Sequence, residues 1–199
     1  ETMTVDDLLK AAVIASANDA TVALGEQIAG SEEGFVSMMN ARAKELGMTN
    51  THFTNPHGLH NEEHYTSARD LLTLAVEAMK NDIIAELVAQ DEVVLPITNK
   101  HDRTTTKYTT NHLISQKSTG EYYYEGAFGI KTGTTTPAGL CLVAGCSKGD
   151  YTYYSVVLGC EKMEGRSLQF EETIKLINWG AASYSQQVML SSSEPITTV

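Results

Sequence analysis

The first 90 residues of the chain repeat apolar residues at helical spacing. Apolar side chains that recur every three or four residues share one face of a helix. This pattern predicts five helices, over residues of about 4–15, 20–29, 31–46, 67–79 and 82–88. Two of them begin with a capping box, in which a hydroxyl side chain and an acidic side chain three residues later satisfy free N–H groups. These boxes are Thr4 with Asp7, and Ser67 with Asp70.

After about residue 92 the pattern becomes that of β-strands. Runs rich in β-branched and aromatic residues predict strands over residues of about 93–97, 104–110, 128–132, 140–146 and 151–159. Lys148-Gly149-Asp150 lies between the last two strands and is a hairpin signal. A final helix is predicted over about 166–179, with Gly180 as its end. The fold class is therefore α+β, an antiparallel sheet flanked by helices.

Composition and charge exclude several classes of partner. The 199 residues carry a net charge of −11, which argues against nucleic acid because nucleic-acid-binding proteins present basic faces. No apolar run approaches the roughly 18 residues of a membrane-spanning helix. No signal peptide opens the chain, so the protein is either cytoplasmic or cut from a longer precursor. Cys141, Cys146 and Cys160 lack metal-type spacing and are expected to be buried free thiols.

The junction of the first two helices carries the first candidate residues, Ser16 and Asn18. Asn18 or Asp19 could simply cap the second helix, and the residues would then be an ordinary helix junction. Alternatively, a polar turn held between two apolar helices presents Ser16 and Asn18 to a cleft. Both interpretations remain open at this point.

A second candidate lies on the predicted strand 128–132 and just after it. Lys131, Thr132 and Gly133 place a cation, a hydroxyl and a backbone without a side chain at consecutive positions. A carboxylate is held by a positive charge and a hydrogen-bond donor, and close approach of a ligand to main chain favours glycine. The three residues could therefore bind the carboxylate end of a peptide.

A histidine-rich loop invites a metal interpretation that the order of its residues opposes. The loop contains His57, His60, Glu62, Glu63 and His64. Zinc hydrolases place two histidines on one helix turn with a glutamate between them, whereas Pro56 and Gly58 break any helix here. A structured loop is the better interpretation, and we expect neither a metal nor a cofactor.

Together these features resemble the serine-type D-alanyl-D-alanine carboxypeptidases, the low-molecular-mass penicillin-binding proteins of bacterial cell-wall metabolism. Ser16-x-Asn18 and Lys131-Thr132-Gly133 look like the second and third motifs of that family. The neighbouring landmarks follow in the same order, over residues 4–9, 14–20, 55–59, 65–70, 129–133 and 138–140. The resemblance implies the penicillin-binding or β-lactamase-like transpeptidase fold.

The resemblance also implies roles for the candidate residues. Ser16, Asn18 and Lys131 would be catalytic, with Ser16 helping to move a proton to the leaving amine and Asn18 binding the substrate amide. Lys131 and Thr132 would bind the terminal carboxylate. Gly133 and Thr134 would complete the substrate-binding strand, with the Thr134 N–H as half of an oxyanion hole.

One departure from the family pattern is large. The first motif, Ser-x-x-Lys, supplies the nucleophile, yet no serine of this chain has a lysine three residues later. We therefore expect a catalytic domain, residues 1–182, that is incomplete at its N-terminus. Residues 183–199 are expected to be a linker and the start of a C-terminal β-rich domain.

The implied activity of the intact enzyme is removal of the terminal D-Ala from peptidoglycan pentapeptides, with β-lactams as inhibitors. The implied location is extracytoplasmic, at the cell envelope or secreted. The alternatives are a non-catalytic module that binds peptidoglycan peptides or β-lactams, and a β-lactamase. Without the missing segment the chain is also expected to expose an apolar seam and to self-associate.

Overall fold

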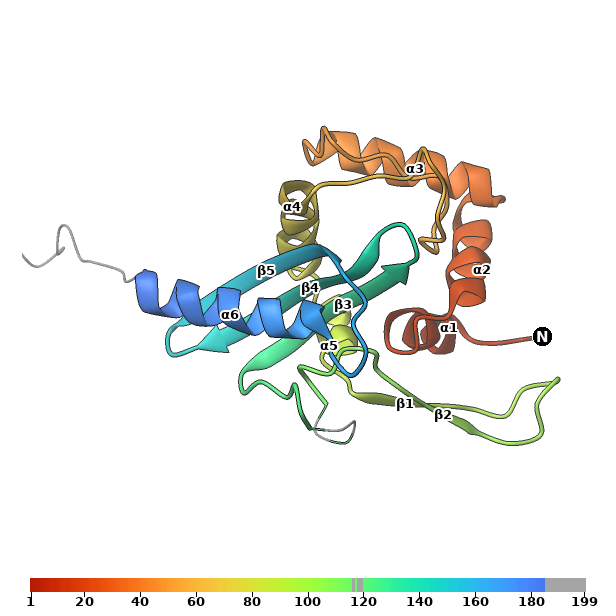
Figure 1. The fold of residues 1–199 in the computed structure, drawn as a ribbon. Coiled ribbons are helices and arrows are strands. Elements are labelled where there is room, and N and C mark those ends of the chain that lie inside the picture. The colour runs from red at the N-terminus through yellow and green to blue at the C-terminus, as the bar shows by residue number, and fades with distance from the viewer. Residues whose placement is uncertain (116, 118–119, 185–199) are drawn as a thin grey trace, which may run out of the picture.

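The computed structural model describes residues 1–184 except 116, 118 and 119 (Figure 1). Its helices are α1 Val5–Val13, α2 Asn18–Ala29, α3 Glu32–Glu45, α4 Ala68–Ala78, α5 Asp82–Val88 and α6 Leu168–Ser183. Its strands are β1 Glu92–Leu95, β2 Thr105–Tyr108, β3 Ala127–Thr135, β4 Gly139–Lys148 and β5 Tyr151–Cys160. The predicted α+β class is confirmed. The predicted linker, 183–199, lies outside the described residues apart from 183 and 184.

The strands form two separate antiparallel sheets. β3, β4 and β5 make a three-stranded sheet in that order, and β1 pairs with β2 in a short ribbon. The predicted hairpin at Gly149 is present, because Lys148 pairs with Tyr151 and Gly149 takes the left-handed φ of 60° that such a turn needs. Within the described residues β3 has a sheet partner on one side only, which leaves its outer edge open to a ligand.

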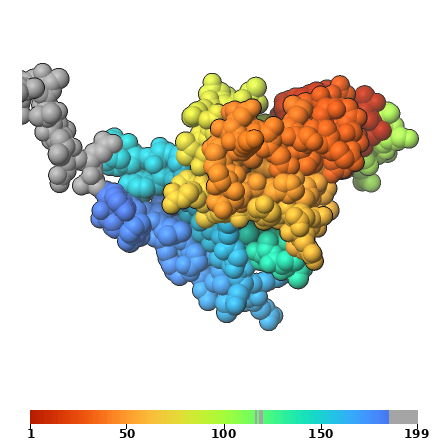
Figure 2. Space-filling view, turned by 90° about the horizontal axis from the view of Figure 1, so that it is seen from above, coloured from red at the N-terminus to blue at the C-terminus, as the bar shows by residue number. Residues whose placement is uncertain are grey.

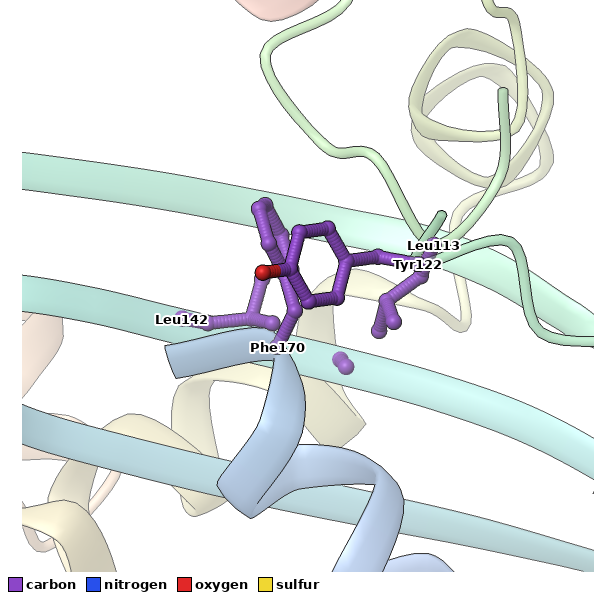
Figure 3. Close-up of a cluster of buried hydrophobic side chains, with 5 residues drawn as sticks. Leu113, Tyr122, Leu142 and Phe170 are labelled. Atoms are coloured by element: carbon purple, nitrogen blue, oxygen red, sulfur yellow. The ribbon is translucent and has the colours of Figure 1, made fainter. Parts of the chain in front are cut away.

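Helices cover both faces of the three-stranded sheet. α6 lies on one face and α4 on the other, and α1–α3 gather at the end of the molecule away from α6 (Figures 1 and 2). A core cluster joins α6 to the sheet and to the segment that precedes β3 (Figure 3). Its buried members are Leu113, Tyr122, Leu142, Ala144 and Phe170. This cluster fixes the position of β3 relative to α6.

The predicted end of the last helix at Gly180 is wrong, because α6 continues to Ser183. Gly180 is buried, and a Cβ added there would lie 3.4 Å from the Tyr153 ring. A Cβ at that distance would make an ordinary van der Waals contact, so Gly180 is a buried residue within α6 that faces β5 and does not end the helix. On its outer face α6 exposes Leu176 and Trp179, by 45% and 59%. Self-association through such a surface stays a prediction.

The cysteine prediction holds in part. All three cysteines are free thiols, but only Cys146 is fully buried, while Cys141 and Cys160 are half-buried. Burial raises the pKa of Cys146 above the ordinary thiol value. The strands place none of the three in the cleft described below.

Both predicted capping boxes place their hydroxyl as expected. Thr4 Oγ1 accepts a hydrogen bond from the Asp7 N–H at 3.1 Å, and Ser67 Oγ accepts one from the Asp70 N–H at 3.2 Å. These bonds begin α1 and α4. The Asp70 side chain has a further task, because it is almost completely buried and reaches the segment that leads into the histidine-rich loop.

Asp70 anchors the entry to that loop. Its Oδ2 accepts hydrogen bonds from the Asn50 N–H and from Thr51 Oγ1, each at 2.8 Å. Burial alone raises the pKa of Asp70, but these hydrogen bonds outweigh it and hold the pKa below its ordinary value. His52 and Tyr65 then pair as an isolated antiparallel bridge and join the two ends of the loop.

We predict that Asp70→Asn lowers the melting temperature at pH 7 by a few degrees and reduces the loss of stability in acid. A carboxylate whose pKa is lower in the folded than in the unfolded state stabilises the fold above the unfolded pKa of about 3.9. That contribution is lost as the pH falls through the lower folded-state pKa. Thermal melts between pH 7 and 2 measure both effects. Asp102→Asn, at an exposed turn, is the control, and identical melts for the two variants would contradict the anchor.

Candidate functional site

Ser16 lies in a strained turn between α1 and α2. Its φ is +57°, the left-handed region, and it is the only described residue other than glycine with a positive φ. Non-glycine residues adopt this conformation rarely, and it is often associated with functional sites. The turn is held by a hydrogen bond from the Ala17 N–H to the Ala11 carbonyl at 3.0 Å. It directs the chain from α1 into α2 with Ser16 at the corner.

Neither Asn18 nor Asp19, the two candidate caps, is the N-cap of α2, although Asp19 Oδ1 accepts a hydrogen bond from the Ala20 N–H at 2.9 Å. The N-cap is Ala17, which has no side chain able to cap, and Asn18 is already the first helical residue. The left-handed turn at Ser16 brings the chain into the helix one residue earlier than a cap at Asn18 would. The Asn18 side chain is consequently exposed and lines a cleft, which favours the second of the two interpretations of this junction.

Lys131 joins the helical junction to the sheet. Its Nζ donates a hydrogen bond to Ser16 Oγ, a residue 115 positions away in sequence, and another to the Thr132 carbonyl at 3.1 Å. Burial lowers the pKa of Lys131 below the ordinary lysine value. No carboxylate of the described residues bonds to its Nζ, so the fold gives Lys131 a hydroxyl partner and leaves its charge uncompensated. The two sequence motifs thus meet in one place.

The next residues of β3 face open space. Thr132 Oγ1 shares a hydrogen bond with Thr110 Oγ1, a residue that the sequence did not single out. Gly133 has no positive φ, and a Cβ added there would meet no described atom within 4 Å. Neither backbone conformation nor packing within the described part of the protein therefore requires glycine at 133. Its absent side chain leaves room beside the exposed Thr134 for a ligand.

These residues line a cleft of about 580 Å³. One wall is the α1–α2 junction, and the facing wall is β3. A third wall is the histidine-rich loop, which contributes Asn55, His57, Gly58 and His64 among others. Gln169 of α6 also lines the cleft. All six residues predicted from the sequence are present in it: Ser16, Asn18, Lys131, Thr132, Gly133 and Thr134.

Hydrogen bonds within the loop give this third wall its shape. Asn55 Oδ1 accepts from the Gly58 N–H at 2.7 Å, and Asn55 Nδ2 donates to the Leu59 carbonyl at 2.9 Å. His64 Nδ1 accepts from the Thr54 N–H at 3.2 Å, and burial is the main cause that lowers the pKa of His64. His64 Nδ1 therefore serves as a structural hydrogen-bond acceptor in the loop.

His57, like His64, is engaged in a structural contact of its own. His57 Nδ1 accepts from the Leu59 N–H at 3.2 Å, and its Nε2 lies 3.5 Å from Glu32 Oε1. In the part of the chain that the structure describes, no three His, Cys, Asp or Glu side chains are arranged to hold a metal ion.

No helix among the described residues is long and apolar enough to cross a bilayer.

Comparison with known proteins identifies the family. The family model described as D-alanyl-D-alanine carboxypeptidase matches residues 1–162. The chain belongs to this family. It is 37% identical over 202 residues to the D-alanyl-D-alanine carboxypeptidase DacF of Bacillus subtilis, covering 100% of this chain and 48% of that protein. It is 36% identical to DacC of Escherichia coli, covering 89% of this chain and 41% of that protein. The chain thus spans about half the length of these relatives.

Solved structures of similar proteins share the fold. The crystal structure of the Streptomyces K15 DD-transpeptidase has a TM-score of 0.80 and 31% identity, over 90% of this chain and 68% of that one. Penicillin-binding protein D2 of Listeria monocytogenes, in its cefotaxime-bound form, has a TM-score of 0.74 and 29% identity. That match covers 91% of this chain and 68% of the Listeria chain. The predicted penicillin-binding fold is confirmed.

Sequence reasoning missed parts of the carboxypeptidase-family cleft that depend on tertiary contacts. Thr110 gave no signal, because it lies just past a short exposed strand and reaches Thr132 only in the folded chain. The wall of the cleft that the histidine-rich loop forms could have been found from residues 55–59, because they are one of the landmarks of the family resemblance. Gln169 was not singled out in the sequence. Only the packing of α6 brings it to the cleft.

We predict that Lys131→Met is at least as stable as the wild type at pH 7, by up to about 1 kcal/mol, because it removes a buried and uncompensated charge. A lysine whose folded pKa is lowered destabilises the fold at neutral pH. This penalty disappears as the pH rises toward the unfolded pKa of about 10.4. Urea denaturation at pH 7 and pH 10 measures the stability of both proteins, and only the wild type should gain stability at the higher pH.

Lys148→Met is the matched control, because the hydrogen bond to the Tyr124 hydroxyl raises the pKa of Lys148. A raised lysine pKa stabilises the fold at neutral pH, so this variant should be less stable than the wild type. A large loss of stability in Lys131→Met, comparable to that of a core truncation, would show that Lys131 is structural.

Proposed function

We propose that this chain forms the substrate cleft of a serine-type D-alanyl-D-alanine carboxypeptidase, which removes the terminal D-Ala from peptidoglycan stem peptides. The observation that carries the proposal is the hydrogen bond between Lys131 Nζ and Ser16 Oγ. It unites the two motifs at a cleft of peptide size whose wall is an open strand edge. Membership of the carboxypeptidase family supports the same reaction.

In this proposal the peptide lies antiparallel along the outer edge of β3, as an added strand. Its terminal carboxylate is bound by Lys131 and by the Thr132 hydroxyl, which the hydrogen bond to Thr110 orients. The Thr134 N–H forms one half of an oxyanion hole for the carbonyl under attack. Asn18 binds the amide of the preceding residue.

The reaction proceeds through an acyl-enzyme. A serine Oγ attacks the D-Ala–D-Ala carbonyl, the C–N bond breaks, and the leaving D-Ala takes a proton at its amine. Water then hydrolyses the ester and restores the serine. Ser16 and Lys131 relay the proton to the leaving amine, and the lowered pKa of Lys131 favours release of that proton.

The nucleophile of this reaction is proposed to come from residues outside the present sequence. No Ser-x-x-Lys occurs in the 199 residues, and the chain matches only about half of its relatives. Ser16 is assigned to proton transfer because its Oγ already accepts the hydrogen bond of Lys131.

β-Lactams are proposed as inhibitors of the complete enzyme, supported by the cefotaxime-bound Listeria neighbour. The proposed location is extracytoplasmic.

We predict that this chain alone forms no stoichiometric covalent adduct with penicillin and does not hydrolyse D-Ala-D-Ala peptides. The reason is that the nucleophile and its activating lysine are absent from it. Intact-mass spectrometry after penicillin treatment measures the adduct. A penicilloyl mass increase in every molecule would contradict the assignment, and the encoded residues that precede Glu1 provide an independent check. A Ser-x-x-Lys there supports the enzyme, whereas its absence supports a module that only binds.

We predict that the chain binds a D-Ala-D-Ala-terminated peptide without cleaving it and that Gly133→Val weakens this binding at least tenfold, about 1.4 kcal/mol. The valine side chain occupies the space beside β3 that the ligand needs, while no described atom lies within 4 Å to clash with its Cβ. NMR titration measures the affinity, and thermal melting checks that the fold is intact. Thr152→Val, on the exposed side of β5, is the control.

The stereochemical control is the same peptide ending in L-Ala-L-Ala, which should bind weakly to both proteins. Equal binding of the D-Ala peptide by the wild type and Gly133→Val would exclude β3 as the binding edge. Equal binding of the L- and D-peptides would exclude the proposed substrate.

A further inference from the structure

One cleft-lining side chain has no role in the proposed reaction. Gln169 lies near the start of α6 and is only 8% exposed. Its Oε1 is buried without a hydrogen-bond partner, and no described residue bonds to its Nε2. A buried primary amide normally forms hydrogen bonds at both ends. Here the amide oxygen is buried without a partner, and the side chain that carries it borders the cleft.

The surroundings do not explain why this position is polar. Its neighbour Phe170 and the residue two turns further on, Ile177, are both apolar and 2% exposed. An apolar residue at 169 would leave no buried amide oxygen without a partner. The described buried atoms without partners also include Asn111 Nδ2, Ser155 Oγ and Thr173 Oγ1, but of these four residues only Gln169 lines the 580 Å³ cleft. The unpartnered amide of Gln169 is therefore the one among them that adjoins the space for a ligand.

We propose that Gln169 is a specificity-determining residue that exchanges hydrogen bonds with a neutral amide group of the bound peptide. The inference rests on the proposed function, because it assumes that the cleft binds a peptide. A peptide unit presents one N–H donor and one carbonyl acceptor. A primary amide presents the complementary acceptor and donors, so the two groups can satisfy each other in a place that water leaves on binding.

A neutral amide is a better match than a carboxylate for this subsite. Lys131 is the only lysine or arginine among the described residues that line the cleft, and it is already assigned to the carboxylate. Burying a second anionic group against an uncharged amide would leave that charge without a partner, which is costly. In this proposal Lys131 binds the charged carboxylate of the peptide, and Gln169 binds a neutral amide group of it.

The test compares Gln169→Met with the wild type on two ligands. One is an acetylated lysyl-D-alanyl-D-alanine with a free carboxylate, and the other is the same peptide with a C-terminal carboxamide. Methionine has a similar volume and no amide, so we expect affinity for both peptides to fall by a similar factor of about five to ten. The melting temperature should rise, because an unsatisfied buried amide is removed. NMR titration and thermal melting measure the two effects.

Thr173→Val is the matched control. Thr173 lies one turn further along the same buried face of α6, is 0% exposed and has an unpartnered Oγ1, but it does not line the cleft. Its replacement should raise the melting temperature as well, yet leave both affinities unchanged. Gln169→Leu serves as a second variant, and a lower melting temperature for both Gln169 variants would contradict the unpartnered amide.

The remaining outcomes separate this inference from the proposed function. Unchanged affinities in Gln169→Met overturn the role of Gln169 and leave the proposed function intact. A loss confined to the free-carboxylate peptide, or a carboxamide peptide that the wild type does not bind, overturns the assignment of a neutral amide. A wild type that binds neither peptide overturns the proposed function, and this inference with it.

Discussion

The burial of one lysine against a helix junction is the constraint on which the cleft depends. Lys131 is carried by an edge strand of the sheet, and Ser16 is held at a left-handed corner between two helices. Their contact requires the helical part and the sheet to be packed in a single arrangement. The cluster of Ile14, Leu87 and Val93 contributes to that packing, since it joins the end of α1 to α5 and to the β1–β2 ribbon, and α5 in turn contacts β3. The core thus determines the distance between the two motifs.

Local features of the fold could be predicted from the sequence, and features set by tertiary contact could not. Thr4 and Ser67 were correctly placed as caps because a cap depends on a few neighbouring residues. Gly180 was misread as a helix end because glycine often ends helices, whereas here it is a buried residue within α6 that faces the Tyr153 ring of β5. The N-cap of α2 was also not predicted correctly from the sequence. It is Ala17, because the chain turns through a left-handed conformation at Ser16 and enters the helix earlier than expected.

The candidate site divides in the same way. Ser16, Asn18 and residues 131–134 form short motifs that can be recognised in a linear sequence, and the fold brings all of them to one cleft. Thr110 and Gln169 act through partners or spaces that exist only after folding. A short motif therefore locates the chemistry of such a site, while the residues that orient or select the ligand have to be found from contacts, burial and unsatisfied atoms.

The depth of Lys131 has a consequence for how the cleft responds to salt. The protein as a whole carries a charge of −11, so an anionic ligand is repelled at long range, and this repulsion weakens as ionic strength rises because the Debye length shortens. The attraction to Lys131 acts at close range in a partly buried place that mobile ions scarcely enter. Added salt thus weakens the long-range repulsion between the anionic ligand and the acidic protein, but it leaves the short-range attraction to Lys131 largely unchanged. Such a cleft would capture anions better in concentrated electrolyte than in dilute buffer, the reverse of an exposed basic patch.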